Sequence, residues 1–148
     1  MSYSRPLAAF LLAGLLAAAC APSAGPTPAP SPTPVTTPSP APTGAVIVTF
    51  RVADEEYRIL LRDAEQIDIA QRLLAGEEAP SIPNGVVVRG DAGVNAPWSW
   101  HIDPDSVEFA DMTIEVCDGR PSDVEQQIIT SDRYCPWGAE VIDVAPAD

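Results

Sequence analysis

Residues 45–61 alternate hydrophobic and polar positions in two runs, on either side of the polar pair formed by Asp54 and Glu55. Strict alternation rich in β-branched residues is typical of strands that bury one face. The expected inward positions are Val46, Val48, Phe50, Val52, Tyr57, Ile59 and Leu61. Because the connection is short, the pattern predicts an antiparallel hairpin.

The spacing of hydrophobic residues lengthens to three and four after this hairpin, which predicts a helix. Asp63 occupies an N-cap position, and Gln66 follows three residues later, as in a capping box. The apolar stripe would consist of Ile67, Ala70, Leu73 and Leu74. Gly76 is expected to end the helix because glycine tolerates the left-handed conformation of a C-terminal cap.

Shorter elements are predicted for the rest of the chain. We expect strands at 86–90, 98–102, 111–117 and 139–144, separated in part by loops over 79–85 and 91–97. In the third of these strands, Met112, Ile114 and Val116 would face inward. Ser122 and Glu125 repeat the capping-box pattern and predict a short helix over 122–129. The fold class is therefore α+β: a mostly antiparallel sheet of about six strands, with one main helix and one short helix on one side.

The N-terminus has the features of an export signal. Arg5 precedes an apolar run over residues 7–16 that is too short to span a bilayer comfortably. Small residues lead into Cys20, and this segment resembles the bacterial lipoprotein signal, in which the cysteine is lipidated. We therefore expect residues 1–19 to be a signal peptide and Cys20 to be the membrane anchor of a protein at the bacterial cell envelope or surface. An ordinary secretory signal is the alternative.

The segment after Cys20 differs sharply in composition from the rest. Residues 21–43 contain nine prolines and no charged residue, so they favour an extended polyproline II conformation and have little to bury. We interpret residues 20–44 as the anchor cysteine with a Pro-rich stalk, and residues 45–148 as one globular domain. A proline-rich recognition motif is the alternative.

Acidic residues dominate the charge of that domain. All 21 aspartates and glutamates lie in it against seven arginines, and the chain has no lysine. Such a surface repels phosphate backbones, which makes nucleic acid a poor partner. The excess is typical of a solvated exterior or of an affinity for cations, and we favour the solvated exterior.

Cysteine usage predicts one disulfide. With Cys20 assigned to the lipid, Cys117 and Cys135 are the remaining pair in an oxidising setting. Their bond would close a loop of about 18 residues and contribute about 3 kcal/mol. A metal site is the alternative, although two cysteines and a single histidine fall short of a closed structural zinc set.

The stretch NAPWSWHIDPDS, residues 95–106, contains the only histidine and two of three tryptophans. Alternation along a strand would bury Trp98, Trp100 and Ile102 and place Ser99, His101 and Asp103 on the opposite, polar side.

The candidate binding residues are His101, Asp103, Asp105 and Glu108. Imidazole and carboxylates suit a divalent cation, but Asp-Pro-Asp-Ser is also common turn chemistry beside a solvated histidine. We favour the turn and predict no cofactor.

Two long segments, GVNAPWSWHIDPDSVEFADMTIEVCDGRPSDVE and YCPWGAEV, resemble an uncharacterised family of small exported domains. The shared marks are W-S-W-H, A-D-x-T-I-E-x-C-D-G and C-P-W. The resemblance implies that Cys117 and Cys135 belong together and that Trp98, Trp100 and Trp137 are framework residues. It implies no activity.

These expectations describe a surface-tethered lipoprotein that presents a disulfide-stapled binding domain, whose ligand would be an extracellular protein or a small molecule. Two alternatives remain. One is an enzyme, such as a hydrolase with or without a metal, centred on His101 and the nearby carboxylates. The other is a small inhibitor of secreted proteases that uses the loop between Cys117 and Cys135.

Overall fold

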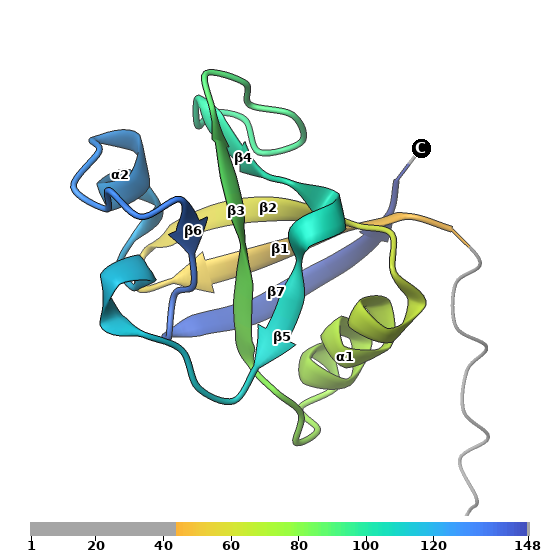
Figure 1. Cartoon of the computed structure of the whole chain (residues 1–148). Coiled ribbons are helices and arrows are strands. Elements are labelled where there is room, and N and C mark those ends of the chain that lie inside the picture. Colours follow the sequence, from red (N-terminus) through yellow and green to blue (C-terminus); the bar gives the residue numbers. More distant parts are fainter. Residues whose placement is uncertain (1–43, 148) are drawn as a thin grey trace, which may run out of the picture. The chain divides into compact units, whose positions relative to one another are not determined.

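The computed structural model describes residues 44–147, in which seven strands form two antiparallel sheets (Figure 1). The predicted signal peptide, the anchor Cys20 and the predicted stalk up to residue 43 lie outside the described residues. Among residues 44–147, no helix is long and apolar enough to cross a membrane.

The first sheet has the strand order β2-β1-β7. Its strands are β1 (Val46–Val52), β2 (Glu55–Leu61) and β7 (Ala139–Pro146). β1 and β2 pair without a register shift, which confirms the predicted hairpin. β7 pairs with the other edge of β1, so the central strand of this sheet buries its inward face completely.

Helix α1 (Ala64–Leu74) confirms the main predicted helix. The Asp63 carboxylate caps its N-terminus by accepting from the backbone N–H of Glu65 and Gln66. The capping box is nevertheless incomplete, because the Gln66 side chain accepts from the backbone N–H of Phe109 instead, at 2.9 Å. At the C-terminus Gly76 adopts a φ of 76°, as expected for a left-handed cap.

The second sheet is built around β3 (Ile82–Arg89), which crosses the strands of the first sheet in Figure 1. Three short strands pair with it: β4 (Trp100–Ile102), β5 (Glu108–Ala110) and β6 (Arg133–Tyr134). A 3₁₀ turn, η1 (Pro104–Ser106), separates β4 from β5. The prediction of a single sheet of about six strands was therefore wrong, although the antiparallel pairing was right.

Aromatic side chains fill the space between the two sheets. Phe50 and Tyr57 stack within the first sheet, with ring centroids 5.2 Å apart. From the second sheet, the rings of Trp100, Phe109 and Tyr134 pack against them. The core therefore joins residues that are distant in sequence, and it fixes how the second sheet lies on the first.

The predicted strand over 111–117 does not form. β3 begins at Ile82, which pairs with Ala110, so a continuing strand would need partners at residues 75–81. That range holds the end of α1 and Pro80, neither of which can extend the sheet. Residues 111–114 are irregular, and a 3₁₀ turn, η2 (Glu115–Cys117), follows them.

The predicted loop over 79–85 is also partly wrong, because β3 already includes Ile82 and Pro83. Pro83 pairs with Phe109, whose N–H points away from β3 toward Gln66. A pair of this kind exchanges no backbone hydrogen bond, so the missing N–H of proline is tolerated there.

The short helix α2 (Pro121–Glu125) is shorter than the predicted helix over 122–129 and begins one residue earlier. Its N-cap is Arg120, whose backbone N–H donates to the Asp123 carboxylate. The predicted partners of the capping box, Ser122 and Glu125, bind other elements instead.

Candidate functional site

His101 lies on β4 and faces away from the core, as the alternation predicted. Its neighbours Trp100 and Ile102 are only 1% and 2% exposed, whereas Trp98 and Ser99 precede the strand, which is shorter than predicted. The imidazole is not freely solvated, because its side chain is 19% exposed and Nδ1 lies 2.8 Å from the carbonyl oxygen of Asp91. Since a carbonyl oxygen only accepts, neutral His101 carries its proton on Nδ1 and its lone pair on Nε2.

A small pocket of about 220 Å³ adjoins His101. Its lining residues are Leu60, Arg62, Asp91, Gly93, Val94, His101, Ile102 and Pro104. Gly93 has a φ of 51°, and a Cβ placed there would lie 3.1 Å from the imidazole, so glycine lets this loop lie against the ring.

No catalytic pair with His101 is evident in this pocket. Ser99, two residues before His101, donates its hydroxyl to Glu125 at 2.9 Å and its backbone N–H to the same carboxylate. A hydroxyl engaged in this way is not oriented by the histidine.

The three predicted carboxylate ligands do not converge on His101. Asp103 accepts from the backbone N–H of Asp105 and caps η1, which is the turn chemistry expected from the sequence. Asp105 forms an exposed ion pair with Arg62 at 3.4 Å. Across residues 44–147, no group of three or more His, Cys, Asp or Glu side chains is placed to hold a metal ion.

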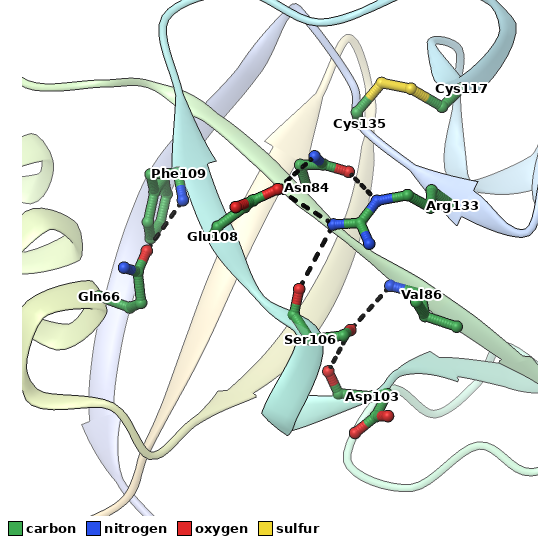
Figure 2. Close-up of polar contacts among 10 residues, drawn as sticks. All are labelled: Gln66, Asn84, Val86, Asp103, Ser106, Glu108, Phe109, Cys117, Arg133 and Cys135. Atoms are coloured by element: carbon green, nitrogen blue, oxygen red, sulfur yellow. Dashed lines mark hydrogen bonds and ion pairs between the residues drawn. A yellow bond between two sulfur atoms is a disulfide. The ribbon is translucent and has the colours of Figure 1, made fainter.

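Glu108, the fourth candidate, belongs to a polar network around Arg133 (Figure 2). The Arg133 guanidinium donates to Asn84 at 2.8 Å, to the Ser106 carbonyl at 3.4 Å and to Glu108 at 3.3 Å. The Ser106 hydroxyl in turn accepts from the N–H of Val86 at 2.8 Å. Because these bonds join β3, β5, β6 and η1, the network holds the second sheet together.

The most exposed hydrophobic side chains form what we call the apolar strip: Met112, Ile114, Val116 and Trp137. Their exposed fractions are 84%, 69%, 65% and 45%. Trp137 adjoins the other three, since its indole N–H donates to the Thr113 hydroxyl at 2.7 Å. Exposed hydrophobic side chains that gather in this way are typical of an interaction surface.

Both ends of the segment that carries the strip are fixed. Ala110 pairs with β3 immediately before it, and the Cys117–Cys135 disulfide, with Cα atoms 5.1 Å apart, holds its other end. The predicted disulfide is thus confirmed. The strip is held open to solvent by the framework around it.

A groove of about 290 Å³ runs beside the strip. One wall comes from Met112, Thr113, Ile114 and Cys117, and the other from Asn84, Ser131, Asp132 and Arg133. The groove therefore combines apolar side chains with a carboxylate and a guanidinium.

Three exposed carboxylates surround the strip and groove, on Asp111, Glu115 and Asp132. Within residues 44–147, none of them forms an ion pair with an arginine or with His101. The guanidinium of Arg133, by contrast, is engaged by Glu108. The electrostatic field at the strip is therefore dominated by negative charge.

Two features escaped the sequence analysis. The apolar strip was assigned to the core, because its alternation resembles that of a buried strand. Asn95 was placed in a loop, yet it is fully buried, accepts from the Arg58 N–H at 2.7 Å and donates to the Trp100 carbonyl at 2.9 Å. Its position in the motif VNAPW carried no signal of that role.

The three tryptophans, which the resemblance assigned to the framework, differ in their surroundings. Trp100 is buried, and Trp98 is half-buried with its indole N–H donated to the Glu56 carbonyl. Trp137 is the most exposed of the three and belongs to the apolar strip.

Comparison with known proteins gives one result. A family model described as the BP-74 N-terminal domain matches residues 44–148, which is the whole of the folded part. No curated protein and no solved structure matches the chain.

Proposed function

This chain belongs to the BP-74 N-terminal domain family, and we propose that its domain is a binding module that captures a protein partner through the apolar strip. The carrying observation is the exposure of Met112, Ile114 and Val116, each at least 65% accessible in a segment fixed at both ends. Solvent-exposed apolar side chains on a rigid support suit recognition, because little conformational freedom is lost when a partner binds.

The proposal includes a tether. The lipoprotein-like signal and Cys20 would attach the chain to the envelope membrane of a bacterium, and the Pro-rich segment would hold the domain away from the bilayer. Cys20→Ser should abolish labelling by a tagged fatty acid while the domain stays folded. Equal labelling of the variant and the parent would contradict the anchor.

Site-specific photo-crosslinking of the full chain on cells tests the binding role. A photoreactive residue at Ile114 should give discrete adducts with a partner. Ile128 is the matched control, because it is the same residue type with a similar exposed fraction, 65% against 69%, and lies outside the strip. Adducts at Ile128 that equal those at Ile114, or no adduct at Ile114, would contradict a binding role for the strip.

A further inference from the structure

We infer that the partner segment seated on the apolar strip is cationic and amphipathic, with hydrophobic residues on the strip and lysine or arginine side chains toward the carboxylates around it. This inference rests on the proposed function and adds the chemical class of the partner.

The hydrophobic half of the recognition comes from side-chain spacing. Met112, Ile114 and Val116 occupy alternate positions, and Trp137 adjoins them through its bond to Thr113. A partner must cover several separate side chains along one line, which a segment with a continuous apolar face does. A single inserted side chain would leave most of the strip in water.

The charged half comes from carboxylates that lack an intramolecular partner. Asp111 and Glu115 alternate with the apolar residues, and Asp132 forms the facing wall of the groove. Because no arginine pairs with them among residues 44–147, their charge is available to a partner. Complementary charge around an apolar contact accelerates association and excludes partners of the wrong sign.

An acidic partner is disfavoured for the same reason. The one guanidinium at the groove, that of Arg133, already donates to Asn84 and Glu108. The whole chain carries a formal net charge of −13, so an acidic segment would approach against the field.

The groove indicates how one basic residue would bind. Lysine and arginine have apolar stems with a charged end, and both parts can be satisfied at once where apolar and acidic groups face each other. Met112 and Ile114 line one wall and Asp132 the other. A stem lying along the apolar wall would therefore bring its charged end to the Asp132 carboxylate.

Binding of defined peptides to the full chain tests the inference. The probes are a labelled amphipathic peptide of leucine and lysine and its counterpart with glutamate in place of lysine. We expect at least about tenfold tighter binding of the lysine peptide, weakening as salt rises from about 50 to 500 mM. Met112→Ser, Ile114→Ser and Val116→Ser combined should abolish it.

Matched charge variants separate a local effect from a global one. Neutralising the strip carboxylates (Asp111→Asn, Glu115→Gln, Asp132→Asn) should weaken binding about tenfold, as expected for three exposed ion pairs. The control neutralises three other exposed carboxylates on β2, α1 and β7 (Glu56→Gln, Asp68→Asn, Asp143→Asn), with the same change in net charge. It should change affinity less than about twofold.

Several results would overturn the inference. Equal binding of both peptides, or equal weakening by both charge triples, would show that the strip has no preference for a basic partner. Binding of neither peptide, together with crosslinks from Ile114, would overturn the cationic class and leave the binding role intact. A dimer in sedimentation that the serine triple dissociates would make a second copy of the chain the occupant.

Discussion

The rings of Tyr57 and Tyr134 meet edge to face in the core, with centroids 5.3 Å apart, yet only one of their buried hydroxyls is satisfied. Tyr134 donates to the carbonyl oxygen of Gly119 at 3.0 Å. The hydroxyl of Tyr57 has no hydrogen-bond partner anywhere in residues 44–147. A buried hydroxyl without a partner is destabilising, whereas a bonded one contributes to stability.

Removing the two hydroxyls should therefore have opposite effects. Tyr57→Phe should raise the free energy of unfolding by about 1 kcal/mol, and Tyr134→Phe should lower it by about 1 kcal/mol. Urea unfolding of both variants measures the contrast. A similar loss in both would show that the Tyr57 hydroxyl is satisfied in solution.

Stability should fall in alkaline solution. Burial raises the pKa of both Tyr57 and Tyr134 above the usual 10.0, because the phenolate would lose its hydration. The unfolded chain releases these protons above about pH 10 while the folded chain keeps them. The free energy of unfolding is thus at its full value below about pH 10 and falls by about 1.4 kcal/mol per pH unit for each tyrosine above it. Urea unfolding across this range should show the decline, with half the slope in Tyr57→Phe; a flat profile would contradict the burial of both rings.

Adjacent residues on β4 should respond very differently to truncation. Trp100→Ala should cost about 3–5 kcal/mol, because it removes a buried ring that contacts Tyr57 and Tyr134. His101→Ala should cost about 1 kcal/mol, the value of one hydrogen bond from a partly exposed ring. Thermal or urea unfolding would reveal a reversed order, which would mean that β4 has the opposite face inward.

Asn95 should be among the polar residues most important for stability. Asn95→Ala leaves the N–H of Arg58 and the carbonyl of Trp100 without their partner, which should cost about 2–4 kcal/mol. Asn84→Ala is the control, because Asn84 bonds only exposed or half-buried side chains, and it should cost less than about 1 kcal/mol. Similar losses in the two variants would contradict the bridging role of Asn95.

Reduction of the disulfide should destabilise the domain by about 2–4 kcal/mol, since the bond constrains the unfolded chain. Unfolding with and without reductant measures this difference, and the thiol content of the denatured, unreduced protein provides the control. Reactive thiols from Cys117 and Cys135 in that control would show that the bond is absent in solution.

Local patterns were sufficient for part of this fold. The β1–β2 hairpin, α1 and β7 follow from alternation and capping residues that lie within a few positions of one another. The inward facing of Trp100 and Ile102 follows from the same periodicity.

The remaining elements depend on contacts that sequence spacing does not encode. Residues 111–117 alternate like a strand but lack a partner, because α1 ends and Pro80 occurs where that partner would have to be. β6 is only two residues long and exists because it pairs with Gly85 and Val86.

The candidate site shows the same limit. His101, Asp103, Asp105 and Glu108 are neighbours in sequence, but η1 and the strands on either side direct them to separate partners. Proximity along the chain therefore did not produce a shared site. The apolar strip, which no local motif distinguishes from a core strand, became visible only through its exposure.

That exposure separates recognition from folding. Met112, Ile114 and Val116 lie outside the core, so exchanging them should change the free energy of unfolding by no more than about 0.5 kcal/mol. Natural variation at these positions is consequently constrained by the partner rather than by the requirement to fold. One framework can therefore diversify its specificity through three side chains, in the way that an antibody domain varies its loops over a constant scaffold.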